Sequence, residues 1–428
     1  MDPDARSLAS ADPGVSHGRA DFGARVAWSV GGSLLFALSQ WLLVVAMARW
    51  GSARLVGDWT LALAITAPVF ILAQCKLRFV LAADATREYP WTRYLALRVR
   101  STGVAASVIG VVVLVAYRDL TGLLIILIAL GKGVEGVCDI RYGRLQRDDD
   151  MRGITVALVR RAFVVLSLAV ATLWLTRSAA WTALAALAGQ GIGLWLDTVW
   201  ARRPAAEPDG GPSLGALLRR TLPLGLATAI GSLQAGLPRF VLDAEVSREA
   251  VGTFSLLVYP YMVGALLVGS MANVALPGLA RLAAAGDWRR FRRTVVGLCG
   301  AGGAMSLSTV LLTWAVGGPA LRFLYGAQYA GFAHELLWIS LAMSLSWCFL
   351  FLGTALDAIR TYAVQPWIFG ASTAVVAAGA MYLAAAHGMI GVTWAMIAGS
   401  LVEGTLLLLV LSRSVARARG TVRAAITH

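Results

Sequence analysis

The stretch Thr121–Ile140, TGLLIILIALGKGVEGVCDI, decides the fold, because it reads as a membrane span and yet carries three charges. Lys132, Glu135 and Asp139 lie three and four residues apart, which places them on one face of a helix. A charge in the middle of a bilayer costs about 3 kcal/mol even on the mildest insertion scale. This face must therefore meet a protein partner or a water-filled cavity, which favours a transporter over a passive anchor.

The composition places most of the chain in lipid. Of the 428 residues, 58% are hydrophobic and 14% are charged, and the mean hydropathy is +0.72. Soluble domains carry roughly 25% charged residues. We therefore expect an all-α, polytopic membrane protein. Residues 1–24 contain two prolines and no apolar core, so they are predicted to form a disordered cytoplasmic tail rather than a signal peptide.

Runs of about 20 apolar residues are long enough to span a bilayer. The sequence contains twelve such runs, at 26–48, 59–82, 97–117, 121–142, 155–176, 180–201, 221–242, 251–276, 294–316, 334–355, 365–386 and 389–411. Their order predicts two six-helix bundles, an N-lobe at 25–201 and a C-lobe at 221–412. A linker rich in proline and glycine, 202–220, joins the lobes, and a basic cytoplasmic tail follows at 413–428.

An internal repeat supports this division. Ser52–Leu61, SARLVGDWTL, aligns without a gap with Ser247–Leu256, SREAVGTFSL, at an offset of 195 residues. Both stretches fall at the turn between the first and second helix of a six-helix half. Parallel repeats of this kind place a substrate site at the interface between the halves.

Several other classes of function are disfavoured. The four cysteines and four histidines are scattered, so we expect no disulfide, metal site or cofactor. The sequence contains no P-loop motif that would indicate an ATP-driven pump. The loops predicted outside the membrane are short, and no catalytic set is presented on a soluble domain, so we expect no enzyme activity. The net charge of +14 is explained by topology rather than by a nucleic-acid partner.

With these features, the chain resembles the polysaccharide-exporting branch of the multidrug/oligosaccharidyl-lipid/polysaccharide (MOP) flippase superfamily, the O-antigen (Wzx-type) lipid-linked oligosaccharide flippases. The resemblance covers residues 25–412. The stretches that carry it are Leu55–Pro68 with Lys76–Arg78, Arg93–Arg98, Lys132–Gln146 with Met151, Leu237–Phe240 with Val251–Ser255, and Leu276–Arg281 with Gly286–Asp287. No subgroup of known sugar specificity matches.

The resemblance implies two pseudo-symmetric six-helix bundles arranged in a V around a cationic central cavity. It also implies a substrate, an oligosaccharide on a polyprenyl diphosphate, which crosses a bacterial inner membrane for O-antigen, capsule or exopolysaccharide synthesis. Membrane lipid, a polymerase and other polysaccharide assembly proteins are the further partners that it implies.

Basic side chains suit that anionic head group, because arginine binds phosphate as a bidentate fork and lysine as a point charge. The candidate head-group contacts are Lys132, Arg78, Arg239 and Arg161. Glu135 and Asp139 are expected to restrain Lys132 or to carry a coupling proton.

Structural roles for these candidates stay open on the sequence alone. Lys132 can pair with Glu135 and be tied to Asp139 only to hold the helix in place. Arg78 can be an anchor at the helix end whose charge reaches the interface. At least one of the neighbours Arg160 and Arg161 is expected to be a topology anchor. Arg239 can pair with Asp243, four residues on.

Three alternative functions also stay open. A cation-coupled drug exporter of the same superfamily is expected to carry acidic rather than basic residues in its cavity. A membrane polymerase or glycosyltransferase would need a large outer loop with acidic catalytic residues. A scaffold without transport activity would not need charges inside a membrane helix.

The distribution of basic residues generates a prediction about topology. With the N-terminus inside, 27 of the 37 basic residues lie on the cytoplasmic side, 7 lie opposite and 3 lie within helices. Reporter fusions after residues 150, 210 and 288 should therefore report the cytoplasm, and a fusion near residue 246 should report the outside. An outside signal at residue 210 would contradict twelve spans with both termini cytoplasmic.

Overall fold

The computed structural model describes residues 13–84, 87–199, 212–361 and 364–426, and among these residues it contains helices and no strand. The helices are α1 (Pro13–Trp50), α2 (Ala53–Gln74), α3 (Leu77–Ala83), α4 (Trp91–Ala116), α5 (Leu120–Arg147), α6 (Met151–Thr176), α7 (Ala179–Val199), α8 (Leu214–Glu245), α9 (Arg248–Ala284), α10 (Trp288–Tyr325), the 3₁₀ helix η1 (Ala327–Phe332), α11 (Ala333–Ala358) and α12 (Gln365–Ile426).

Each of the twelve predicted spans corresponds to a helix or half-helix in the described residues. Nine helical stretches there are long and apolar enough to cross a membrane, with α12 taken as one. Helices α5 and α8, of 28 and 32 residues, also have spanning length. Helix α12 holds the last two spans, because Gly388 breaks it with φ 56°. The halves of α12 fold back on each other, since the Ser372 hydroxyl donates to the Gly399 carbonyl at 3.1 Å.

The second predicted span differs from the helices of the structure in two ways. The second span begins at Ala53 rather than 59, because the Ser52 side chain caps the helix by accepting from the Leu55 amide at 3.2 Å. This span is also broken into α2 and α3, since Cys75 and Lys76 both adopt left-handed backbone angles with φ 48°.

Helical structure extends into both of the tails predicted from the sequence. Helix α1 already begins at Pro13, a residue that the first turn of a helix tolerates, while residues 1–12 lie outside the described part. Helix α12 continues to Ile426, through alanines and arginines that favour helix. The predicted linker, 202–220, lies outside the described residues up to residue 211, and α8 begins within it at Leu214.

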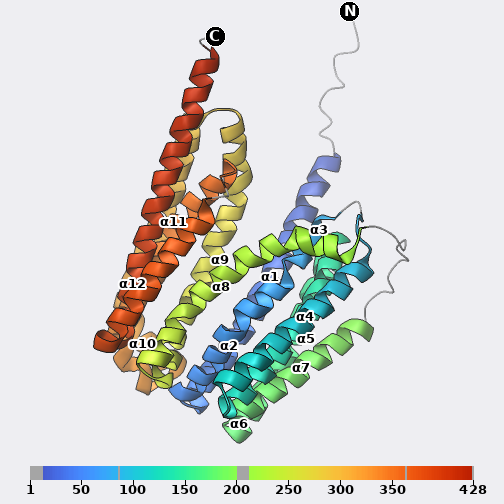
Figure 1. Ribbon diagram of the computed structural model, residues 1–428, viewed down its shortest axis with the longest axis vertical. Helices are drawn as coiled ribbons and strands as arrows, with labels where there is room; N and C mark the ends of the chain where they lie inside the picture. The colour runs from blue at the N-terminus through green and yellow to red at the C-terminus, as the bar shows by residue number, and fades with distance from the viewer. Residues whose placement is uncertain (1–12, 85–86, 200–211, 362–363, 427–428) are drawn as a thin grey trace, which may run out of the picture.

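The helices form two groups, α1–α7 and α8–α12 (Figure 1). Helix α2 joins the groups by packing against both α8 and α9. Helix α1 begins and α12 ends at one end of the molecule, called here the terminal end. The α1–α2 turn at Ser52 and the α8–α9 turn at Ser247 lie at the opposite end, called here the repeat end.

The apolar side chains divide between a core and an outer face. The core is continuous from α1 through α2, α8 and α9 into α11, with Met47, Leu61 and Phe254 almost fully buried. Large apolar side chains such as Phe163 and Trp314, with 71% and 75% exposed, project outward. Apolar exposure on this scale marks a surface that contacts lipid.

Close packing of α10 against α11 generates a prediction about stability. A Cβ at Gly302 would lie 2.9 Å from the Trp347 carbonyl oxygen, whereas a Cβ at Gly300, on the same helix, would meet nothing within 4 Å. Gly302→Ala should therefore destabilise the protein by ~1–3 kcal/mol through overpacking. Gly300→Ala should be neutral or slightly stabilising, because alanine favours helix. Thermal unfolding of both variants in detergent measures the difference, and equal midpoints would contradict this packing.

Candidate functional site

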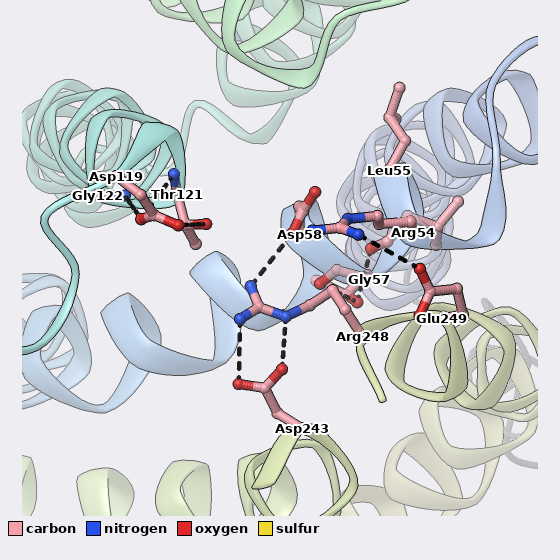
Figure 2. A network of polar contacts seen from close by, with 12 residues as sticks. Arg54, Leu55, Gly57, Asp58, Asp119, Thr121, Gly122, Asp243, Arg248 and Glu249 are labelled. Carbon is pink, nitrogen blue, oxygen red and sulfur yellow. Dashed lines mark hydrogen bonds and ion pairs between the residues drawn. The ribbon is translucent and has the colours of Figure 1, made fainter. Parts of the chain in front are cut away.

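Helix α5 carries the charged face predicted from the sequence. It begins where the Asp119 carboxylate caps it, accepting from the amides of Thr121 at 3.1 Å and Gly122 at 3.3 Å (Figure 2). About three turns further on, Lys132 Nζ donates to Glu135 Oε2 at 2.8 Å. Both side chains are partly exposed, at 31% and 23%. The pair predicted by the three-residue spacing therefore forms.

Asp139, one turn beyond Glu135, pairs with arginines and not with Lys132. Arg78 Nη1 of α3 donates to Asp139 Oδ1 at 3.1 Å, and Arg98 Nη2 of α4 donates to Asp139 Oδ2 at 3.3 Å. The Arg98 side chain is only 1% exposed. Arg98 was not among the residues predicted for the site, because an arginine near the start of a predicted span is typical of the boundary between membrane and water. Arg78 also donates to Gln146 at 3.3 Å, so it is held inside the protein and is not a free anchor.

Tyr142 continues the same face of α5 and connects two further arginines. Its hydroxyl donates to Asp197 of α7 at 3.0 Å, and Asp197 also forms an ion pair with Arg160 of α6. The Tyr142 ring lies 6.0 Å from the guanidinium carbon of Arg78 and 5.3 Å from that of Arg161. These are cation–π distances, so the ring joins two of the predicted head-group residues.

Arg161 lies inside the first group of helices. Its residue is 2% exposed, and its guanidinium lies 5.2 Å from the Phe36 ring of α1. Arg161 and Lys132 both lie within electrostatic reach of the Glu135 carboxylate. Because Arg161 is buried and Arg160 is paired with Asp197, neither is an exposed anchor at the membrane surface.

Arg239 brings a basic group from the second group of helices. Its Nε donates to Ser255 Oγ of α9 at 3.0 Å, and its Nη1 donates to the Ala235 carbonyl at 3.1 Å. Tyr259, one turn beyond Ser255, lies within electrostatic reach of both Arg239 and Lys132. Tyr259 was not among the residues predicted for the site from the sequence.

Asp243, the partner that the sequence spacing offered to Arg239, binds a different arginine. Asp243 does not pair with Arg239, because both of its oxygens bind Arg248, at 2.5 Å and 3.2 Å. A four-residue spacing along α8 allowed the first pairing, but the turn into α9 places the Arg248 guanidinium closer.

Glycines make room for the arginines of this site. A Cβ at Gly143 would lie 3.1 Å from Arg78, and a Cβ at Gly193 would lie 2.8 Å from the Arg161 stem. Helices that pack this closely in a membrane use small residues at the contact. A bulkier residue at Gly143 would displace the Arg78 guanidinium from Asp139, and one at Gly193 would displace the Arg161 guanidinium from the Tyr142 ring.

The charge balance of the site favours an anion. Four basic side chains, Arg78, Arg98, Lys132 and Arg160, share the three carboxylates of Glu135, Asp139 and Asp197, and Arg161 and Arg239 add two further basic groups. Arg161 keeps two buried guanidinium nitrogens without an acceptor, so hydrogen-bonding capacity remains. Within the described residues, no group of three or more His, Cys, Asp or Glu side chains could hold a metal ion.

Of the four predicted head-group residues, the structure links three. Lys132 pairs with Glu135, Arg161 lies within electrostatic reach of Glu135, and Lys132 and Arg239 both lie within electrostatic reach of Tyr259. Arg78 belongs to the neighbouring Asp139 cluster and reaches the others only through the Tyr142 ring.

Comparison of the sequence with known proteins finds a relative that is described as a polysaccharide biosynthesis protein. No family model matches the sequence. The chain is 25% identical over 345 residues to the capsular polysaccharide biosynthesis protein CapF of Staphylococcus aureus, and the match covers 78% of this chain and 85% of that protein.

Solved structures of MOP transporters share the fold. An inward-facing multidrug resistance MATE family transporter matches with a TM-score of 0.74 and 13% identity, over 89% of this chain and 95% of that chain. The lipid II flippase MurJ in an inward closed conformation matches with a TM-score of 0.68 and 12% identity, over 90% and 87%. An outward-facing MATE transporter gives 0.59 at 15% identity, over 93% and 96%. The fold that the resemblance implied is confirmed, and the proteins that share it here are transporters and a flippase.

The buried pair between Arg98 and Asp139 generates a prediction. Asp139→Asn leaves the Arg98 guanidinium buried without its counter-charge, which should destabilise the protein by ~3 kcal/mol. The double variant Asp139→Asn with Arg98→Met should recover much of this loss. Asp148→Asn is the matched control, because Asp148 pairs with Arg87 and Arg144 at an exposed helix end. Thermal unfolding in detergent measures all three, and a single variant as stable as the control would contradict the pairing.

Proposed function

We propose that the chain is a flippase that moves a polyprenyl-diphosphate-linked oligosaccharide across the bacterial inner membrane, for the synthesis of a surface polysaccharide. The fold of MOP transporters and the similarity to CapF, a capsular polysaccharide biosynthesis protein, support this function. MurJ, a lipid II flippase, has a similar fold. Both termini lie in the cytoplasm in this proposal, and a polymerase acts on the product outside.

One observation carries the proposal. Lys132 of the first group and Arg239 of the second group both lie within electrostatic reach of Tyr259 on α9, and α9 packs against α2 of the first group. A substrate held there contacts both groups, as alternating access about a central site requires. A diphosphate suits the site, because it offers several anionic oxygens to ammonium and guanidinium donors.

The residues act by binding, without covalent chemistry. In the absence of substrate, Glu135 holds Lys132 at 2.8 Å, and Ser255 holds Arg239 at 3.0 Å. A diphosphate head group replaces these acceptors with charge-assisted hydrogen bonds, while the polyprenyl tail stays in lipid. On release, Glu135 and Ser255 accept the donors again. This exchange keeps binding weak enough for turnover.

A drug exporter for organic cations is less well supported. Its site would need an excess of carboxylates, whereas basic groups outnumber carboxylates here. We place no coupling cation at Glu135, since Lys132 and Arg161 already neutralise it.

The proposal predicts a loss of export without a loss of protein. Lys132→Ala should reduce polymer export in cells by about a hundredfold, which corresponds to roughly 3 kcal/mol for a charge-assisted contact. Lys132→Arg should retain part of the export, because the positive charge remains. Surface polysaccharide per cell, normalised to the protein in the membrane, is the measurement.

The other lysine provides the control for this prediction. Lys76→Asn should export normally, since Lys76 is exposed in the break between α2 and α3, where asparagine tolerates the backbone angles. Normal export by Lys132→Ala at native expression would show that Lys132 does not bind the head group.

A further inference from the structure

The two copies of the internal repeat lie against each other at the repeat end. Gly57 of the first copy and Gly252 of the second copy occupy equivalent positions, and so do Ala53 and Arg248. A Cβ at Gly57 would collide with the Arg248 carbonyl, and a Cβ at Gly252 would collide with the Ala53 carbonyl. The contact is therefore reciprocal, as across a two-fold axis, and the backbones of α2 and α9 touch without side chains between them.

An ion-pair network surrounds this glycine contact (Figure 2). Arg248 of α9 binds Asp243 of α8 within the second group of helices, and its Nη1 reaches Asp58 of α2 at 3.1 Å across the interface. At the exposed edge of this network, the Arg54 guanidinium and the Glu249 carboxylate approach to 3.9 Å. Because both side chains are exposed, this pair adds little to the stability of the contact.

Further contacts close the same end beside the network. Gln328 of η1 donates to the Ala48 carbonyl at 3.2 Å, and the Trp41 indole donates to the Tyr325 hydroxyl at 3.0 Å. Arg49 donates to the Leu324 carbonyl at 2.9 Å. These bonds join α1 to α10 and η1, which belong to different groups.

The binding residues lie directly behind this closure. Ser255, which holds Arg239, is one turn from Gly252 on α9 and is fully buried. Thr60 is the equivalent of Ser255 in the first copy of the repeat and is 2% exposed. Separation of the two copies would open both positions to the repeat end.

We propose that the contact between Ser52–Leu61 and Ser247–Leu256 is the gate that closes the substrate site at the repeat end, with Asp58–Arg248 as its latch. The inference rests on the proposed function for the direction in which the gate faces. The asymmetry of the latch suits repeated opening. When the halves part, Arg248 keeps Asp243 and is never left unpaired, while Asp58 passes into water at the opened end. Opening therefore breaks the Asp58–Arg248 pair and the exposed Arg54–Glu249 pair, and it strands no buried guanidinium.

Cysteine labelling in the membrane tests the gate directly. In a chain whose native cysteines, Cys75, Cys138, Cys299 and Cys348, are replaced by alanine, Thr60→Cys and Ser255→Cys serve as two separate reporters. A membrane-impermeant maleimide is added to intact cells, where it reaches the repeat end. Asp58→Asn and Gly252→Ala should each raise the labelling rate about tenfold, equivalent to about 1.4 kcal/mol of closed-state preference.

Matched controls separate the gate from general loosening. Glu88→Gln removes the exposed pair with Arg220, which links α8 to the loop before α4, and should not raise the labelling rate. Gly269→Ala adds a methyl group on α9 where nothing lies within 4 Å and should also leave it unchanged.

The outcomes are distinct from those of the export experiment. Labelling needs no substrate, so the experiment can detect a gate in a protein that exports no polysaccharide. A protein that exports polysaccharide can likewise show no change in labelling. Unchanged labelling of both reporters by Asp58→Asn and by Gly252→Ala, in proteins present at normal levels, would overturn the gate. So would an equal rise in the two controls.

Discussion

The cost of burying charge in a bilayer governs this structure. An unpaired charge at the membrane centre costs about 3 kcal/mol or more, so each charged residue of α5 needs a partner from another helix or from its own. Lys132 pairs with Glu135, and Asp139 pairs with Arg78 and Arg98. The Tyr142 hydroxyl donates to Asp197. These pairings fix α5 against α3, α4 and α7. The arrangement of the first group of helices therefore follows from satisfying one polar face.

The same constraint connects packing to function. Because basic groups outnumber carboxylates around α5, the helices form a cluster with spare positive charge, and Tyr259 on α9 lies within electrostatic reach of both Lys132 and Arg239. The repeat end shows the complementary arrangement, in which Arg248 is shared between Asp58 and Asp243. A surplus of donors suits binding of an anion, whereas a shared donor suits a contact that opens and closes.

The sequence predicted the helices well and the polar contacts only in part. The lengths of the hydrophobic runs predicted where the helices lie. The three-residue spacing of Lys132 and Glu135 predicted their ion pair. Both signals are local in the sequence. The partners of Asp139 come from α3 and α4, at distances along the chain that periodicity does not encode. Arg98 was missed because a buried arginine and a boundary arginine look alike in sequence. The repeat at Ser52 and Ser247 was visible, but its self-contact required the fold.

Transport by the purified protein tests the central claim most directly. A polyprenyl-diphosphate-linked oligosaccharide with a fluorescent sugar is placed in liposomes with and without the protein, and an impermeant reagent quenches only the outer leaflet. The account predicts rapid loss of the protected fraction with the wild-type chain and little loss with Lys132→Ala. A protected fraction that decays no faster with the wild-type chain than in protein-free liposomes would contradict it.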